Sequence, residues 1–324
     1  MRAIKVSKHG DASVLAFSSV EPQPVPGDGQ ALVRIQAAGV NFVDIYHRRG
    51  TYPLTLPFIP GLEAAGVVEA VGSGVTMVRS GDRVAYTGHI GSYAEFTAIA
   101  ADRLIRLPEN ISFIEGAAFP LQGMTAHYLI HEFRTPRPGD TVLIHAAAGG
   151  VGLLLVQWAK RLGARVIGTV STPEKAAAAR AAGADHVIEY TVADFAAETK
   201  RITGGRGADL ILDGVAKATF PGDLECVAVR GHIVVFGSAS GPADPIVPNM
   251  LGPRSFSLSG GSLGNFIATR EELELRSGAV LAAVREGWLK LRVDQVFPLA
   301  EAAKAQRLLE SRGSIGKIVL QVTA

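Results

Sequence analysis

The sequence has almost no cysteine, since Cys226 is the only one in 324 residues. An internal disulfide is therefore excluded, and nothing in the cysteine usage indicates secretion. Cys226 lies within the segment Leu-Glu-Cys-Val-Ala-Val at residues 224–229. We expect it to be a buried structural thiol.

Long apolar runs and a strong excess of charge are also missing. No apolar run approaches the roughly 20 residues that a membrane-spanning helix needs, and the first residues are typical of a strand without a signal-peptide core. A net charge of +2 and an aromatic content of 6% do not indicate nucleic acid or an anionic membrane as a partner. We therefore predict a cytoplasmic protein.

The residues that are present indicate a globular protein of two domains. Hydrophobic residues make up 48% of the chain and charged residues 19%, and 324 residues exceed the usual size of a single core. Glycine and proline recur at short intervals over about the first 120 residues, where alternating segments such as 31–37 predict half-buried strands. This pattern favours a compact, barrel-like β domain.

The segment from Val142 to Val170 is the most informative part of the sequence. A strand pattern, a turn of small residues, an apolar-periodic helix and a second strand predict a βαβ unit. The turn has Ala147, Gly149 and Gly152 in the spacing of a dinucleotide-binding motif, with alanine at the first glycine position. Small residues let the backbone approach a pyrophosphate, and the helix N-terminus offers it free N–H groups. The segment predicts a dinucleotide site, and the alternative is a tight turn of another α/β protein.

The end of the second strand indicates which dinucleotide binds. NAD sites usually have Asp or Glu there, which accepts hydrogen bonds from a ribose 2′-hydroxyl. This strand ends instead in Ser171 and Thr172, with Lys175 one helical turn later, and a Ser/Lys pair suits a 2′-phosphate. Glu174 lies in the first helical turn, where a carboxylate suits the helix dipole. NADPH is the predicted cofactor, and a solvated Lys175 is the alternative.

Strand and helix patterns continue to alternate after this unit. Short, nearly continuous apolar strands separated by helices predict a parallel, doubly wound sheet over residues 123–267. Beyond about Thr269, a helix is followed by two strands that flank a further helix, and we expect these strands to return to the first domain. The predicted domains are therefore 1–122 with 268–324, and 123–267.

Seven segments, in order, resemble the zinc-free quinone oxidoreductase branch (the zeta-crystallin-like proteins) of the medium-chain dehydrogenase/reductase superfamily. The resemblance covers essentially the whole chain. The segments are GVNFVD at 39–44, PGLEAAG at 60–66, GDRV at 81–84, PLQGMTA at 120–126, the turn at 147–152, GAD at 183–185 and VFG at 235–237. The resemblance implies an α/β protein with a GroES-like, β-barrel-type catalytic domain and a Rossmann domain that binds NADPH.

Two positions distinguish the chain from the zinc alcohol dehydrogenases of this superfamily. Those enzymes look like Gly-x-Cys-His-Thr-Asp and Gly-His-Glu where this chain has Asn41 and Leu62. A catalytic zinc needs about three ligands of the Cys, His or carboxylate type, and the four clustered cysteines of the structural zinc lobe are also absent. We expect His47, His89 and His127 to be surface or loop histidines, and we predict no metal.

The resemblance also implies roles for individual residues. Asn41 would lie near the nicotinamide, where its amide N–H could polarise a quinone carbonyl. Tyr46 and Tyr52 would suit a flat substrate, and Gln122 would lie where the domains meet, against the nicotinamide ribose or amide. These four are the predicted catalytic residues. The predicted cofactor-binding residues are Thr125, Gly149, Gly150, Val151, Gly152, Ser171, Lys175, Tyr190, Phe236, Gly237, Ser238 and Lys317.

Several of these residues have a structural alternative. Tyr46 and Tyr52 are then ordinary loop aromatics, Thr125 packs a helix, Tyr190 is a strand-end aromatic, and Lys317 is a surface lysine. Asp213, at another strand end, would cap the next helix rather than touch a ligand.

The predicted function is zinc-independent reduction of quinones by hydride or electron transfer from NADPH. Hydride delivery to such an acceptor needs alignment and a donor for the developing oxyanion. An enone or enoyl-thioester reductase is the first alternative, with a carrier phosphate bound near Arg48 and Arg49. A non-catalytic NADPH-binding, RNA-binding or structural protein is the second. A homodimer is predicted because Phe256–Ser262 would leave an open sheet edge.

Overall fold

The computed structural model describes residues 1–322, which form two compact units. The first, the β unit, comprises Met1–Leu121, Ala268–Ser277 and the chain from Leu291. The second, the α/β unit, comprises Gln122–Ile267 and Gly278–Lys290.

The C-terminal part of the chain divides differently from the domains expected from the sequence, which assigned all of 268–324 to the first domain. Residues 278–290 belong to the α/β unit. Val280 packs closely against Gly123, since a Cβ on this glycine would lie only 2.9 Å from the valine side chain. The rings of Trp158 and Trp288 also meet there at 5.2 Å.

The β unit is built on a seven-stranded sheet. The strand order is β14 (Val293–Pro298), β15 (Lys317–Gln321), β3 (Gln30–Val40), β4 (Glu63–Val71), β5 (Arg83–Thr87) and β7 (Ile105–Arg106), and β6 (Phe96–Ala100) also pairs with β3. All pairs are antiparallel except β14 with β15. The two C-terminal strands therefore complete the sheet of the N-terminal segment, as the sequence predicts.

Short elements complete the β unit. They are the hairpin strands β1 (Ala3–Lys5) and β2 (Ala16–Ser18) and the helices α1 (Phe42–Arg49), α2 (Phe113–Gly116) and α10 (Ala302–Glu310). The core of this unit joins inward-facing residues of the strands to α10; examples are Ile35, Val84, Ile318 and Ala305. Helix α9 (Arg270–Arg285) belongs to both units.

The α/β unit contains a six-stranded sheet in which every pair is parallel. The strand order is β10 (His186–Glu189), β9 (Arg165–Val170), β8 (Thr141–Ile144), β11 (Ala208–Asp213), β12 (Val227–Val235) and β13 (Ser257–Gly260). The order reverses between β8 and β11, and ligands of such sheets bind beyond the carboxyl ends at that point. The predicted doubly wound fold is confirmed.

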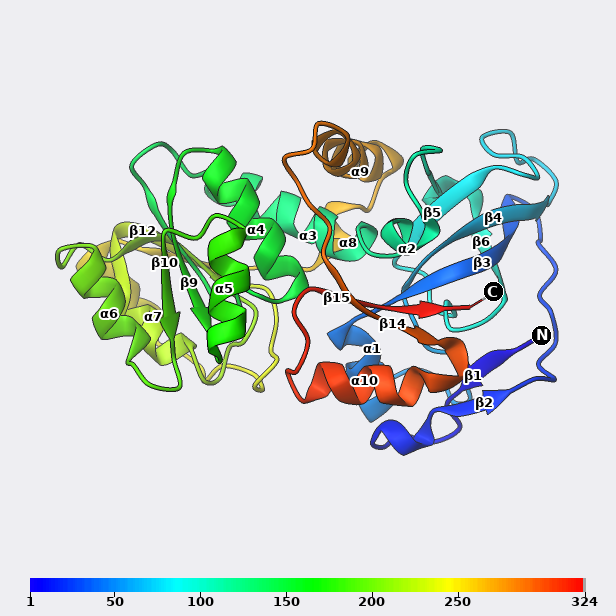
Figure 1. The fold of residues 1–324 in the computed structure, drawn as a ribbon, viewed down its shortest axis with the longest axis horizontal. Coiled ribbons are helices and arrows are strands. Elements are labelled where there is room, and N and C mark those ends of the chain that lie inside the picture. Colours follow the sequence, from blue (N-terminus) through cyan, green and yellow to red (C-terminus); the bar gives the residue numbers. More distant parts are fainter. Residues whose placement is uncertain (323–324) are drawn as a thin grey trace. The chain divides into compact units, whose positions relative to one another are not determined.

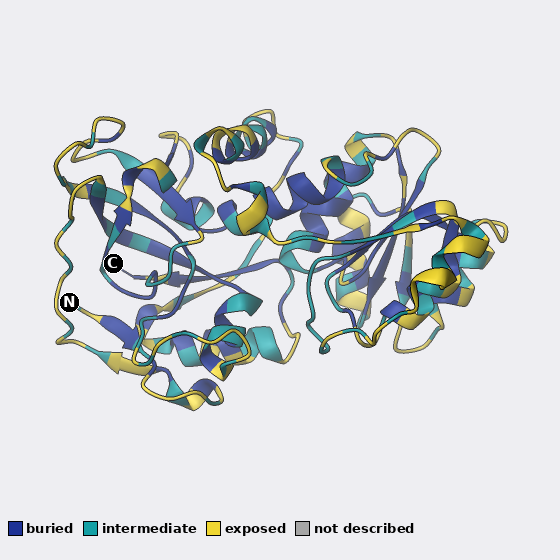
Figure 2. Cartoon of the chain, turned by 180° about the vertical axis from the view of Figure 1, so that it is seen from behind, coloured by how far each residue is buried: buried dark blue, intermediate teal, exposed yellow. Residues whose placement is uncertain are grey.

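Helices cover both faces of this sheet. They are α4 (Gly150–Arg161) and α5 (Pro173–Ala181) on one side and α6 (Phe195–Ile202) and α7 (Phe220–Cys226) on the other (Figure 1). Helices α3 (Pro120–His131) and α8 (Leu263–Phe266) complete the unit. The strands between the helices are buried, whereas the outer helix faces are exposed (Figure 2). Cys226 is 1% exposed, as expected.

Strand β12 begins earlier than the sequence pattern predicts. The apolar segment starts at Gly231, but the strand already starts at Val227 and passes through Arg230, which has a φ of 61°. The local pattern does not reveal this irregularity because charged and left-handed residues are rare inside strands. Across residues 1–322, no helix is long and apolar enough to span a membrane.

Candidate functional site

The glycine turn connects β8 to α4 at the point where the strand order reverses. Ala146 has a φ of 49°, and the N–H of Gly149 donates to its carbonyl at 2.8 Å. Gly149 is the N-cap residue of α4, so the first N–H groups of that helix begin in the turn. The turn is held to β9 by the N–H of Ala147, which donates to the carbonyl of Thr169 at 3.0 Å.

Close packing explains why glycine is needed in this turn. A Cβ on Gly152 would lie 2.3 Å from the carbonyl oxygen of Ala146, and the backbone cannot yield easily there. A Cβ on Gly150 would lie 2.0 Å from Oε1 of Gln122. Gln122 therefore lies directly against the turn, and Thr125, one helical turn further along α3, is 7% exposed.

The predicted 2′-phosphate residues gather at the ends of β9 and β10. Thr172 caps α5, its hydroxyl accepting from the N–H of Lys175 at 3.3 Å. The N–H of Tyr190 donates to the carbonyl of Val170, and the hydroxyl of Thr191 donates to that of Ser171. Ser171, Lys175 and Tyr190 thus lie on adjacent segments.

The segment after β12 packs against the segment after β11. The N–H of Phe236 donates to the carbonyl of Asp213 at 2.9 Å, and the Phe236 ring covers Gly214. A Cβ on Gly237 would lie 2.7 Å from the carbonyl oxygen of Gly214. Phe236, Gly237 and Ser238 therefore lie at the carboxyl edge of the sheet.

A buried polar cluster beneath this edge was not predicted. His145, next to the glycine turn, contacts the Thr169 hydroxyl through Nδ1 at 2.9 Å and Asp223 through Nε2 at 2.7 Å. Burial raises the pKa of Asp223 to about 7, although His145 opposes the shift. Burial alone would lower the pKa of His145, but the Asp223 carboxylate outweighs it and the pKa lies above its usual range. The sequence signal for this cluster was His145 itself, a single polar residue between the apolar strand and the turn of small residues.

Asp213 does not cap the next helix, because the N-cap residue of α7 is Thr219. One of its oxygens accepts from the N–H groups of Val215 and Ala216, and the other accepts from the Thr219 hydroxyl. It fixes the loop that leads into α7.

In the β unit, Asn41 lies in a buried polar cluster with Glu63 and Lys317. Nζ of Lys317 donates to Oδ1 of Asn41 at 2.7 Å and to Oε2 of Glu63 at 2.5 Å. Nδ2 of Asn41 donates to the same Glu63 oxygen at 3.0 Å. All three side chains are at most 3% exposed. Lys317 is therefore not a surface lysine. Glu63 was not predicted as a site residue, although it is a charged residue directly before the apolar segment 64–68.

The backbone of Asn41 is held from the other side by Asp44. The N–H of Asn41 and the hydroxyl of Tyr93 donate to Oδ2 of Asp44 at 2.9 and 3.0 Å. Burial raises the pKa of Asp44 to about 7, although these two hydrogen bonds act in the opposite direction. Asn41 is thus fixed at the start of α1 through both its backbone and its side chain.

Aromatic side chains of α1 and the following loop form a small group. The rings of Tyr46 and Tyr52 meet edge to face at 5.2 Å, and His47 approaches Tyr52 at 6.2 Å. Tyr52 is 48% exposed. The group offers flat apolar area and hydroxyl tips to a ligand.

The three histidines do not form a metal site. Within residues 1–322, no group of three or more His, Cys, Asp or Glu side chains gathers in a way that could hold a metal ion. The expectation of a surface histidine was wrong for His127, which is buried in α3 with its ring 5.4 Å from that of Trp158. Burial lowers the pKa of both His47 and His89.

Comparisons with known proteins agree over nearly the whole chain. The family models "Alcohol dehydrogenase GroES-like domain" and "Zinc-binding dehydrogenase" match residues 27–109 and 150–277. The chain is 41% identical to a quinone oxidoreductase of Pseudomonas aeruginosa, covering 98% of this chain and 99% of that protein. It is 44% identical to a 2-haloacrylate reductase of a Burkholderia species, covering 91% of each. The structure of Escherichia coli quinone oxidoreductase complexed with NADPH matches with a TM-score of 0.96 and 39% identity, over 99% of this chain and 100% of that one.

Proposed function

Since the chain belongs to the quinone oxidoreductase family of the medium-chain dehydrogenase/reductase superfamily, we propose that it reduces quinones with NADPH and without a metal. The observation that carries the proposal is the glycine turn at the carboxyl edge of the parallel sheet, with Ser171, Lys175 and Tyr190 on the neighbouring strand ends. A dinucleotide bound there would supply the hydride.

The residues of this edge fit NADPH. The glycines leave the backbone open to a pyrophosphate, and Gln122 and Phe236 lie next to the turn and the neighbouring strand ends. Ser171 and Lys175 offer a hydroxyl and an ammonium to a 2′-phosphate. The relative of known structure from Escherichia coli was solved with this cofactor. The roles of Thr125, Val151 and Ser238 are proposed on the same basis.

Zinc independence is supported by the chemistry of the side chains. Asn41 and Leu62 stand where the zinc enzymes have cysteine and histidine, and the polar atoms of Asn41 are bonded to Glu63 and Lys317. Such an amide can donate to an oxyanion that develops on a quinone. Tyr46 and Tyr52 would then hold the flat ring of the acceptor.

A reductase of small enones is the second candidate, because one relative is a 2-haloacrylate reductase. The structure gives less support to a thioester substrate carried on a phosphate-bearing group. Arg48 was expected to contribute to a phosphate-binding patch, but it is fully buried and bonds to Gln306 and Glu310. Only Arg49 of this pair is exposed.

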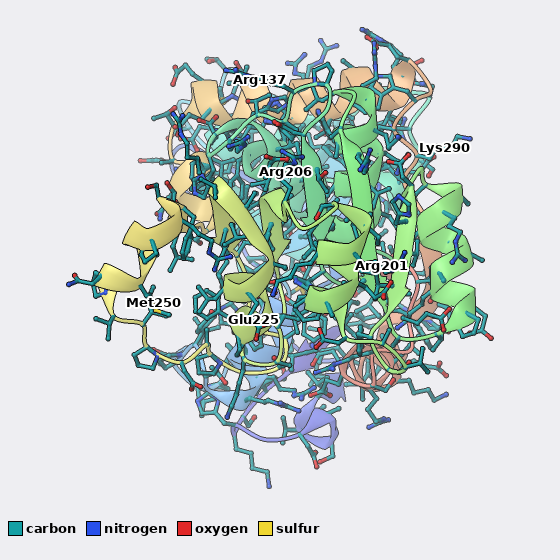
Figure 3. The ribbon with its side chains drawn as sticks, turned by 90° about the vertical axis from the view of Figure 1, so that its left-hand side faces the viewer. Arg137, Arg201, Arg206, Glu225, Met250 and Lys290 are labelled. Carbon is teal, nitrogen blue, oxygen red and sulfur yellow. The ribbon has the colours of Figure 1, made fainter. Side chains whose placement is uncertain are left out.

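Binding of RNA receives little support from the charges of the α/β unit. Arg206 pairs with Asp209, Arg201 with Glu198, and Lys200 with Glu225. Figure 3 shows Arg201, Arg206 and Glu225 on the same side of the molecule. Interspersed acids weaken the field that a phosphate backbone would need.

The proposal is tested by measuring NADPH oxidation with 1,4-benzoquinone, a linear enone, a 2-haloacrylate and ethanal. NADH and a chelator are included in parallel. We expect chelator-insensitive quinone reduction with NADPH preferred. A stronger preference for the enone or haloacrylate would favour the second candidate. Tight NADPH binding without turnover of any acceptor would refute both and leave a non-catalytic role.

Replacing the predicted 2′-phosphate ligands is expected to change cofactor preference. Ser171→Ala with Lys175→Ala removes two hydrogen bonds to a charged phosphate, worth about 1.5–3 kcal/mol each, so the Kd for NADPH should rise by at least about 100-fold while that for NADH stays unchanged. Glu174→Ala is the control, because Glu174 is an exposed neighbour in the same helical turn. An equal loss for both cofactors would contradict the assignment.

We also propose that the protein is a homodimer, in the cytoplasm, paired through β13. This strand is at the edge of the sheet, and Val247 and Met250, in the chain segment that precedes it, are 69% and 44% exposed. Figure 3 shows Met250 at the margin of the α/β unit. An edge strand beside exposed apolar residues suits twofold pairing.

The dimer is tested by light scattering after gel filtration. We expect the mass of two chains for the unmodified protein and a monomer for Val247→Asp with Met250→Asp, because burying two carboxylates in an interface is costly. Val192→Asp, at a residue 82% exposed in the same unit, is the control and should leave the mass unchanged. A monomeric unmodified protein would refute the proposal.

A further inference from the structure

The side-chain amide of Asn41 is enclosed by a buried ion pair. Nζ of Lys317 lies 2.5 Å from Oε2 of Glu63, and the two side chains are 2% and 0% exposed. The ammonium of Lys317 donates to the oxygen of the Asn41 amide, and the carboxylate of Glu63 accepts from its nitrogen. The other Glu63 oxygen accepts from the N–H of Leu121 at 2.6 Å. Both oxygens of the Glu63 carboxylate therefore accept hydrogen bonds.

Room for this ion pair depends on Gly39. A Cβ there would lie 2.3 Å from Oε2 of Glu63, 2.4 Å from the carbonyl oxygen of Ala117 and 2.8 Å from Cε of Lys317. Any larger residue at this point of β3 would displace one member of the pair. The arrangement therefore involves β3, β4 and β15 together.

The ion pair distinguishes the two orientations of the amide. An ammonium only donates hydrogen bonds, and a carboxylate only accepts them. Turning the Asn41 amide by 180° would place its NH2 group against the ammonium and its oxygen against the carboxylate. Both hydrogen bonds would be lost and replaced by repulsion in a buried environment, where unpaired polar groups are costly.

One hydrogen of the amide remains weakly bonded. Nδ2 lies 3.0 Å from Oε2 of Glu63 but 3.5 Å from the carbonyl oxygen of Gly39. The second distance exceeds the usual 2.7–3.2 Å of an N–H···O hydrogen bond. Within the protein, this N–H therefore has only a long contact with the Gly39 carbonyl oxygen.

We propose that Glu63 and Lys317 are positioning residues, which hold the Asn41 amide in the orientation that presents this N–H to the substrate carbonyl. The inference rests on the proposed function. Donation from Lys317 to the amide oxygen also strengthens the N–H as a donor, because linked hydrogen bonds polarise one another. Lys317 then acts through Asn41 and does not contact the cofactor.

The turnover rate of Lys317→Met distinguishes a role in positioning Asn41 from a role in binding the cofactor. We expect kcat for the quinone to fall about 100-fold, the size of losing an aligned oxyanion donor, while the Kd for NADPH changes less than twofold. Lys317→Arg keeps a donor and should recover most of the rate. Lys304→Met, at a surface lysine of α10 paired with Glu301, is the control. A weaker NADPH affinity with unchanged kcat would overturn the proposal.

Exchanging the two charges provides a stricter test. In the double variant Glu63→Lys with Lys317→Glu, the ion pair and Asn41 are retained, but the polarity that faces the amide is reversed. We expect the amide to turn and kcat to fall to the level of Asn41→Ala. A kcat within twofold of the unmodified protein would overturn the proposal.

NMR of the unmodified protein tests the orientation without turnover. Of the two side-chain N–H signals of Asn41, identified by their loss in Asn41→Ala, the one bonded to Glu63 should exchange slowly with water and move in Glu63→Gln. Rapidly exchanging signals that do not respond would overturn the proposal, even if a variant failed to fold. If these signals behave as expected but no quinone is reduced, the proposed function fails and the positioning of Asn41 stands.

Discussion

Gly152→Ala is expected to weaken NADPH binding at least tenfold and to destabilise the α/β unit by about 1–3 kcal/mol, the usual cost of overpacking. The added Cβ would lie 2.3 Å from the carbonyl oxygen of Ala146 and 2.9 Å from Cα of Ala147. Both are backbone atoms of the turn, so the turn itself must move. Because the pyrophosphate would bind to this backbone, the displacement should reduce affinity as well as stability.

The measurements are the Kd for NADPH by titration calorimetry and the midpoint of thermal unfolding. Gly278→Ala is the matched control, since this glycine lies inside α9 with nothing within 4 Å of the added Cβ. It should leave the Kd unchanged and raise stability, because alanine favours a helix by about 1 kcal/mol over glycine. Unaltered NADPH affinity in Gly152→Ala would show that the cofactor does not depend on this turn.

Gly149→Ala separates affinity from stability. Gly149 has a φ of −75°, and its added Cβ would meet only the Ala146 carbonyl oxygen, at 3.1 Å. The variant should therefore fold almost normally. A loss of NADPH affinity in this variant would result from the approach of the phosphate itself.

Arg48→Met is expected to lower the free energy of unfolding of the β unit by about 3 kcal/mol, as for breaking a buried ion pair. Its guanidinium is fully buried and donates to Gln306 at 2.6 Å, to both oxygens of Glu310, and to the carbonyl oxygen of Gly10 at 3.1 Å. These bonds join α1 to α10 and to the N-terminal segment. Methionine fills a similar volume but leaves the polar atoms around it without their donor.

The neighbouring Arg49 is the matched control. It pairs with the same Glu310 at 2.7 Å, but its side chain is 56% exposed. Exposed ion pairs contribute at most about 1 kcal/mol, so Arg49→Met should change the midpoint of urea unfolding much less. Equal effects of the two substitutions would show that burial of Arg48 contributes little.

The fold could be predicted largely from the sequence because its signals are local. The apolar strands, the small-residue turn and the alternation of strands with helices are properties of neighbouring residues, and they predicted the parallel sheet correctly. The return of β14 and β15 to the first unit was also predicted. The start of β12 was not, because Arg230 interrupts the apolar pattern.

The sequence by itself also determined which chemical groups are available: a single cysteine, no acid after the second strand of the βαβ unit, and an amide at position 41. The tertiary structure alone decided what those groups contact. Asn41, Glu63 and Lys317 come together across as many as 276 positions of sequence, and His145 meets Asp223 from another element. Arg48 became a buried structural residue for the same reason. Side-chain partners across a sheet depend on strand order and register, which no local pattern specifies.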